Sequence, residues 1–312
     1  MLKHYFHPCN ITICLNKHTN IEVLNLLYIL TCKHSFFRLR QSESSNLNID
    51  LEENFLLNSS LDENKLITSD TCVLLGINPR YEGSKLNLKL KSRYLKGNFK
   101  IITIGSLFNL TFSSVTLSSN IQILKSLVEG NNLFCQEFIN SSNPLLISNA
   151  EIFKREDAYG LSNMVKSLAK HISSYSRFNG QSQLNILSSA LNDVGFANFN
   201  NLKTIKNKDF RNSTGVYFIN SSFLTSNIKK LLNLKLLNFF QNYKHKNKLL
   251  ITQDSNLEVK RLAILKKSFD VTNHLHLPNT VFFENSGTYI NTEGNINKVV
   301  KVITPLGQAK SD

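Results

Sequence analysis

Short apolar runs rich in branched residues alternate along the chain with stretches whose apolar positions recur every three or four residues. The runs predict buried strands at residues 11–14, 71–75, 99–104, 144–148, 216–219 and 249–252. The helical spacing predicts helices at residues 20–30, 121–128, 161–172, 184–194 and 228–240. Strands that alternate with helices of this length are typical of parallel α/β sheets with crossover helices.

Two features of this pattern bear on how the chain is divided. Residues 83–95 fit both a strand of period two and a helix in which Leu86, Leu90 and Tyr94 stack, so periodicity alone does not decide between them. We expect a strand–helix segment at residues 1–50, a Rossmann-like α/β region at 51–265 and a strand-rich segment at 266–312.

The composition predicts a folded protein, since 41% of the 312 residues are hydrophobic and 19% are charged. Tryptophan is absent and Asn, Ile, Lys and Phe are abundant, a bias typical of the A/T-rich genomes of organelles. The formal net charge of +14 raises the alternative of an organellar RNA-binding protein. The lysines are scattered, however, and no basic patch is interleaved with aromatic residues, which favours a solvated surface.

The cysteines and the N-terminal residues give information about the compartment in which the protein lies. The five cysteines have irregular gaps without a C-x-x-C pair, which fits reduced thiols and predicts no iron–sulfur cluster in this chain. The longest apolar run, residues 21–32, contains Glu22 and Asn25 and is too short to span a bilayer, so we expect an amphipathic or buried helix. No presequence pattern precedes it, which predicts synthesis inside the compartment or a cryptic signal.

The strongest local motif is GINPRYEG, which begins at Gly76. Gly76 ends a predicted strand at the carboxyl edge of a sheet, where open α/β proteins bind ligands, and Pro79 fixes the turn. Arg80 and Glu82 place polar groups at that edge. Two interpretations stay open: the loop from Gly76 to Glu82 holds a nucleotide or an anion, or it braces the neighbouring segment.

Together with a C-terminal segment, this motif resembles the second half of the 75 kDa iron–sulfur subunit of respiratory complex I, NADH:ubiquinone oxidoreductase. That half descends from molybdopterin oxidoreductases. The resemblance covers most of the chain from about residue 11 onward, in collinear segments. The matching positions are Gly76, Asn78, Pro79, Arg80, Glu82 and Asn87 in the first motif, and Leu277, Pro278, Glu284, Thr288, Tyr289, Asn291, Thr292, Glu293 and Gly294 in LPNTVFFENSGTYINTEG.

The resemblance implies a cofactor-free, Rossmann-like domain of the molybdopterin oxidoreductase type. It implies a structural subunit of the peripheral arm of mitochondrial complex I on the matrix side, without membrane insertion and without catalytic, cofactor-binding or metal-binding residues. FMN and iron–sulfur clusters are expected in partner subunits. Because the cluster-bearing first half of the family subunit is missing, we expect a separately and mitochondrially encoded half whose partner is another chain.

Departures from the family pattern leave two further hypotheses. His274 replaces the usual Asp before Leu-Pro, and with His276 it would share one face of a strand, but a metal site needs a third ligand. An active molybdopterin-dependent oxidoreductase is the enzymatic alternative, although the low glycine count of 12 counts against a cofactor held from several domains. No hydrolase, zincin or phosphate-loop motif occurs.

Overall fold

A computed structural model describes residues 11–41, 63–105, 109–155, 157–175, 184–188, 190–197, 199, 202–205, 209, 213–219, 249–254, 273–305, 307 and 309–310. The chain divides into two compact units. The first comprises Met1–Ser44, Ala190–Asn291 and Asn295–Asp312, and the second comprises Ser45–Ser189 with Thr292–Gly294. The helix expected at residues 228–240 lies outside the described residues.

The second unit is built on a five-stranded parallel sheet. Its strands are β3 (Thr71–Leu75), β4 (Lys100–Ile104), β5 (Val115–Ser118), β6 (Pro144–Asn149) and β7 (Leu184–Leu187), in the order β5-β4-β3-β6-β7. Its helices are α2 (Glu63–Thr68), α3 (Pro79–Glu82), α4 (Ser84–Leu95), α5 (Gln122–Val128), α6 (Cys135–Asn140), the 3₁₀ helix η4 (Ala150–Lys154) and α7 (Ala158–Tyr175). Strand order reverses after β4 and β5, since the chain returns to the other side of β3 to add β6 and β7.

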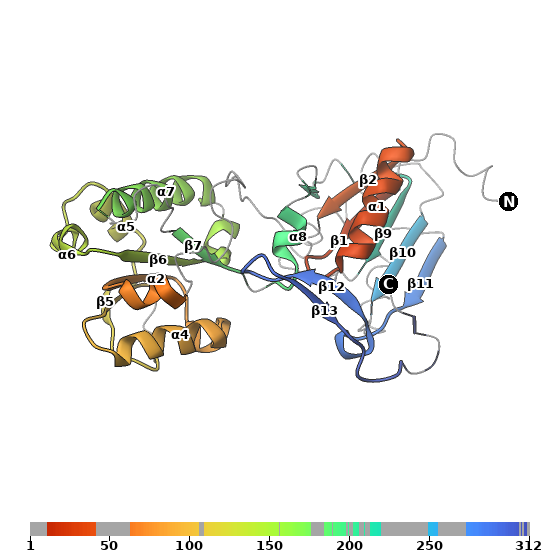
Figure 1. Ribbon diagram of the computed structural model, residues 1–312. Helices are drawn as coiled ribbons and strands as arrows, with labels where there is room; N and C mark the ends of the chain where they lie inside the picture. Colours follow the sequence, from red (N-terminus) through yellow and green to blue (C-terminus); the bar gives the residue numbers. More distant parts are fainter. Residues whose placement is uncertain are drawn as a thin grey trace. The chain divides into compact units, whose positions relative to one another are not determined.

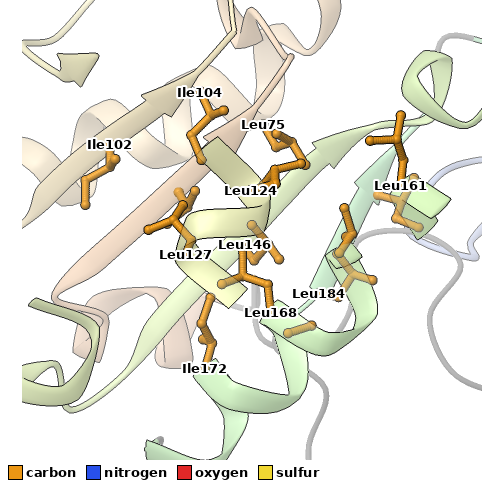
Figure 2. Close-up of a cluster of buried hydrophobic side chains, with 14 of the residues drawn as sticks. Leu75, Ile102, Ile104, Leu124, Leu127, Leu146, Leu161, Leu168, Ile172 and Leu184 are labelled. Carbon is orange, nitrogen blue, oxygen red and sulfur yellow. The ribbon is translucent and has the colours of Figure 1, made fainter. Parts of the chain in front are cut away.

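Helices cover both faces of this sheet, because its strands are apolar on both sides. Figure 1 shows α5 and α7 over one face and α2 and α4 over the other. One buried cluster joins the strands to α5 and α7 through residues that include Leu124, Leu146 and Leu168 (Figure 2). The other joins them to α4 through Leu86 and Leu90. Each fully buried leucine contributes about 1.5–3 kcal/mol to folding, so packing against the sheet fixes where these helices lie.

Segment 83–95, which fits two periods, forms the helix α4. Leu86, Leu90 and Tyr94 lie four residues apart and face the sheet, whereas Leu88 is 66% exposed. A strand would have placed Leu86, Leu88 and Leu90 on one face. The nearby sheet supplies an apolar surface that only the helical register can use.

The prediction of one helix at residues 184–194 is wrong. Leu184–Leu187 forms β7, which pairs in parallel with β6 and is buried at all four positions, and a separate short helix, α8 (Asp193–Ala197), follows. The spacing of Leu184, Leu187, Leu191 and Val194 matched a helix by coincidence. Gly195, expected to stop a helix at this point, lies inside α8.

The first unit contains a six-stranded parallel sheet and a hairpin. The sheet strands are β1 (Ile11–Leu15), β2 (Phe37–Gln41), β8 (Lys203–Thr204), β9 (Gly215–Ile219), β10 (Leu249–Asp254) and β11 (Asn273–Pro278), in the order β11-β10-β9-β1-β2-β8. The 3₁₀ helix η6 (Phe282–Glu284) leads into the antiparallel hairpin of β12 (Gly287–Ile290) and β13 (Ile296–Val299). The expected parallel α/β architecture is therefore confirmed in both units.

Helix α1 (Ile21–Lys33) connects β1 to β2 and begins where expected. The Asn20 side chain accepts a hydrogen bond of 2.9 Å from the Val23 amide, which satisfies one of the free donors of the first turn. Glu22 in the first turn and Lys33 in the last turn have the charges that the helix dipole favours. No described helix is long and apolar enough to cross a membrane.

Candidate functional site

The loop after β3 lies at the carboxyl edge of the five-stranded sheet, beside the end of β4. Gly76 has a φ of +58°, and its amide donates a hydrogen bond of 2.8 Å to the Ile104 carbonyl. Gly105, with a φ of +135°, is so close that an added Cβ would lie 3.3 Å from the Gly76 Cα. A Cβ on Gly76 would lie 2.8 Å from Ile152 Cδ1. The glycines thus allow two backbone segments to meet, and Ile152 fills the space beside them.

The next residues form a capped turn of helix. The Asn78 side chain accepts from the Arg80 amide at 3.2 Å, and Pro79 occupies the first position of α3. The Glu82 carboxylate accepts from the Asn78 amide at 3.1 Å and from the Asn149 side-chain amide, also at 3.1 Å. Because Asn149 ends β6, the motif braces the adjacent strand, as one of the two interpretations expected.

The electrostatics of this edge are set by acidic groups. Partial burial, together with the nearby Glu151 carboxylate, raises the pKa of Glu82, and the hydrogen bonds from Asn78 and Asn149 act in the opposite direction. The Arg80 guanidinium lies over the Tyr81 ring at 5.6 Å and the Arg80 side chain is exposed. The Asn78 and Asn149 donors therefore already bind a carboxylate of the protein itself.

Residues of the C-terminal motif form a second polar group in this unit. Glu293 Oε2 accepts from Lys85 Nζ at 3.0 Å, and Glu293 Oε1 accepts from Lys89 Nζ at 3.3 Å. The Lys85 hydrogen bond is the main cause that lowers the pKa of Glu293, and Lys89 adds to it. The motif residue Glu293 therefore neutralises two lysines of α4.

In the first unit, the carboxyl end of β1 is closed by a buried polar cluster. Lys17 forms an ion pair with Asp193, and both side chains are almost fully buried. Asn192 is wholly buried: its side-chain amide donates to the Thr19 carbonyl at 2.8 Å, and its Oδ1 accepts from the Ile290 amide at 3.2 Å. The position where a doubly wound sheet binds its ligand is here filled by protein groups.

This cluster anchors the hairpin that carries the TYINTEG motif. A Cβ on Gly287 would lie 2.8 Å from the Asn20 side chain, so glycine permits close packing on the start of α1. The Thr288 amide donates to Glu22 Oε2 at 3.0 Å. Partial burial acts to raise the pKa of Glu22, but the hydrogen bonds from the Thr288 hydroxyl and amide outweigh it, and the pKa is lowered.

The sequence did not single out Lys17, Asn192 or Asp193 as functional residues. Each acquires its role only from contacts with distant segments. Lys17 follows β1, Asn192 directly precedes α8 and Asp193 begins it, and the hairpin lies about a hundred residues further along the chain. No local pattern carries that information.

One hollow of about 510 Å³ opens beside the amino ends of β4 and β5 and is lined by residues that include Asp70, Lys100 and Ser113. Asp70 accepts hydrogen bonds from the Ser142 and Asn143 amides, and Lys100 pairs with Glu137. Its charged groups are thus engaged by the protein itself, and it lies away from the carboxyl edge.

The metal hypothesis for His274 and His276 rests on a strand that the structure confirms. Both residues belong to β11, but the side chains of His274 and His276 lie outside the part that the structure describes. Among the described residues, no group of three or more His, Cys, Asp or Glu side chains is arranged to hold a metal ion.

Comparison with known proteins identifies the fold family. The family model described as molybdopterin oxidoreductase matches residues 16–312. The chain belongs to the molybdopterin oxidoreductase family. In a solved structure of the formyltransferase/hydrolase complex (FhcABCD) from Methylorubrum extorquens, bound to methylofuran, one chain has the same fold, with a TM-score of 0.56 and 9% identity over 94% of this chain and 86% of that one.

Within the molybdopterin oxidoreductase family, the chain is similar to subunits of NADH-ubiquinone and NADH-quinone oxidoreductases. It is 34% identical to the NADH-ubiquinone oxidoreductase 75 kDa subunit of Reclinomonas americana over 149 residues. These residues make up 47% of this chain and 21% of that protein. It is 25% identical to the mitochondrial 78 kDa subunit of the same enzyme from Candida albicans, over 84% of this chain. It is 26% identical to a subunit of the NADH-quinone oxidoreductase of Rickettsia typhi, over 86% of this chain. These last matches cover 32% and 35% of the relatives, so the chain spans about a third or less of their length.

The residues at the carboxyl edge do not fit the cofactor for which the molybdopterin oxidoreductase family is named. A pterin nucleotide carries a diphosphate, which needs free backbone donors or cations. Here the Asn78 and Asn149 donors already bind Glu82, and Glu151 adds a second negative group nearby. Ile152 occupies the space beside Gly76. A diphosphate at this edge would meet two carboxylates and would have to displace hydrogen bonds that the protein makes for itself.

Proposed function

We propose that this chain is a structural subunit of NADH-ubiquinone oxidoreductase and carries no redox centre of its own. The observation that carries the proposal is at the carboxyl edge of the five-stranded sheet. There the side chains of Glu82, Asn149 and Ile152 fill the position where open α/β sheets bind ligands. The similarity to two subunits of such enzymes over 84% and 86% of the chain supports the choice of complex. A domain that keeps the fold of its family, but whose own side chains occupy the ligand position, can provide surfaces for other subunits without catalysing a reaction.

In this role the chain lies in the peripheral arm on the matrix side of the mitochondrial inner membrane, and it is encoded in the mitochondrion. Flavin and iron–sulfur clusters belong to its partners. One of those partners is the cluster-bearing N-terminal half of the same subunit, carried on another chain.

The test of the assembly is native electrophoresis of membranes from the source cells, solubilised in a mild detergent. The chain is expected to co-migrate with NADH dehydrogenase activity and to stay with it after a second dimension under harsher detergent. Detection of the chain only in fractions without NADH dehydrogenase activity would contradict the proposal. The matched reference is a flavin-bearing subunit, whose distribution across the gel the chain should follow.

The alternative, an active molybdopterin-dependent oxidoreductase, is favoured by membership of the family. It is tested by elemental analysis of the purified chain. A stoichiometric amount of molybdenum or tungsten would support the alternative, whereas a trace far below one atom per chain supports the structural role.

A further inference from the structure

A set of large apolar side chains is exposed around the C-terminal hairpin of the first unit. Their exposed fractions run from 40% at Phe282 to 81% at Val302. We call this set the hairpin surface; it consists of Val281, Phe282, Phe283, Ile296, Val300, Val302 and Ile303. Single exposed apolar residues are ordinary in folded proteins, but a contiguous group marks an interaction site.

Backbone contacts show that the hairpin surface is contiguous. The Phe283 carbonyl accepts hydrogen bonds from the amides of Val302 and Ile303, at 2.9 and 3.1 Å. The Phe282 and Phe283 rings lie 5.7 Å apart. Along β13 and just beyond it, Ile296 and Val300 lie four positions apart and so share one face of the extended chain. The residues around η6 and those just after β13 thus lie side by side, and exposed Ile296 extends the surface along β13.

The hairpin surface also includes an open strand edge. In the described part of the chain β13 pairs with β12 alone, while β12 also packs on α1 and α8 (Figure 1). Ile296, Asn297 and Lys298 of β13 are all exposed. A free strand edge presents unpaired backbone donors and acceptors, which an extended segment of another chain can use.

The charge around the hairpin surface favours an acidic binding partner over a second copy of this chain. Lys298 and Lys301 are exposed at its rim, and Lys298 lies close enough to Glu22 to help lower the pKa of that carboxyl. Glu22 also accepts from Thr288, and Glu284 accepts from the Val281 amide. The whole chain has a formal net charge of +14. A second copy would bring like charge to a basic rim, and an acidic segment would meet complementary charge.

We infer that the hairpin surface binds an extended segment of a partner polypeptide, apolar at its centre and acidic at its ends, which pairs with the free edge of β13. The partner's apolar side chains cover Phe283 and Val302, and its carboxylates face Lys298 and Lys301. The inference deepens the proposed function and rests on it only for the identity of the complex in which the partner lies.

The experiment compares matched variants expressed in the source cells as full-length chains. The test variants are Val300→Ser with Val302→Ser, and Lys301→Glu. The controls are Leu133→Ser, whose side chain is 86% exposed in the second unit, and Lys91→Glu on the exposed face of α4. Thermal unfolding of each purified chain checks that the fold is kept, which the high exposure of every substituted side chain favours.

The measured quantity is the fraction of chain that stays in the high-mass assembly through a salt wash. The double serine variant should reduce this fraction about tenfold, which corresponds to about 1.4 kcal/mol, because two apolar anchors are lost. Lys301→Glu should reduce it most at low salt, because screening weakens the charge term. Retention of the test variants equal to that of the controls would overturn the inference.

A photo-crosslinking amino acid at position 302, with position 133 as its control, identifies the occupant directly. A crosslink from position 302 to an apolar, acidic peptide of another subunit supports the inference. Crosslinks only to lipid, to RNA or to a second copy of this chain overturn it. If the wild-type assembly lacks NADH dehydrogenase activity but the crosslink and the variant effects hold, the proposed function fails and the hairpin surface stands.

Discussion

Asn192 joins three segments of the first unit that are far apart in the sequence. Its side chain binds the Thr19 carbonyl and the Ile290 amide, and its own amide donates to the Lys17 carbonyl at 3.1 Å. A Cβ on Gly195 would lie 2.1 Å from Asn192 Oδ1, so the glycine allows this side chain its place in the turn of α8. The residue holds the hairpin against the loop after β1.

Asn192→Ala should therefore reduce the free energy of unfolding by about 2–4 kcal/mol, because two buried backbone groups lose their partners. Urea unfolding followed by circular dichroism measures the change. Asn297→Ala, at an exposed position on the same hairpin, is the control and should change the value by less than about 0.5 kcal/mol. Equal effects of the two substitutions would contradict the role given to Asn192.

Glu82 and Glu293 should contribute to the pH dependence of stability with opposite signs. The pKa of Glu293 is lowered in the folded chain, so its contribution is present above the unfolded pKa near 4.5 and is lost as the pH falls. The pKa of Glu82 is raised, so the folded chain loses stability as the pH rises from 4.5 through the folded value.

Unfolding free energies from pH 3 to pH 7 for the wild type, Glu82→Gln and Glu293→Gln measure this difference. Relative to the wild type, Glu293→Gln should lose stability toward pH 7, and Glu82→Gln should gain it. Parallel curves for all three proteins would show that neither carboxyl titrates differently in the folded chain.

At the scale of elements, the sequence was informative wherever a local pattern coincided with packing. The runs that became β3, β4 and β6 are apolar on both faces and end in a glycine or a polar residue, which is a local signal for a buried parallel strand. The same spacing argument was wrong for Leu184–Leu187, because four buried residues contain too little pattern to separate a strand from a helix.

The α4 segment provides a direct test of the element that the sequence left open. Leu90 is fully buried and Leu88 is 66% exposed. Leu90→Ala should cost about 2–5 kcal/mol, whereas Leu88→Ala should fall within about 0.5 kcal/mol of the wild type. A strand would place both residues on one face, so similar losses in a thermal or urea unfolding experiment would contradict the helix.

At the scale of the whole molecule, the order of strands in each sheet had no signal in the sequence. The central strand of the six-stranded sheet, β1, pairs with β2 on one side and with β9, some two hundred residues later, on the other. The polar cluster around Lys17, Asn192 and Asp193 was missed for the same reason, since its members meet only through this topology. The brace at Glu82 was one of two interpretations of the sequence, because its motif is local.

Thiol reactivity should report the two sheets separately. Cys14 in β1 and Cys72 in β3 are fully buried, and burial is the main cause that raises the pKa of each thiol, whereas Cys32 on α1 is exposed. Alkylation of the native chain, followed by mass spectrometry of peptides, should label Cys32 within minutes and the other two only after unfolding. Rapid labelling of Cys72 in the native chain would contradict the buried sheet.

The interleaved first sheet has a consequence for the order in which the protein can form during synthesis. The second unit is nearly continuous in the sequence, from Ser45 to Ser189, and all the strands of its sheet leave the ribosome together. The first sheet contains β1 and β2 from the start of the chain and β9, β10 and β11 from its last hundred residues. The apolar β1 therefore lacks its partner β9 until about two hundred further residues have been synthesised, and during that time it can contact other nascent chains and chaperones.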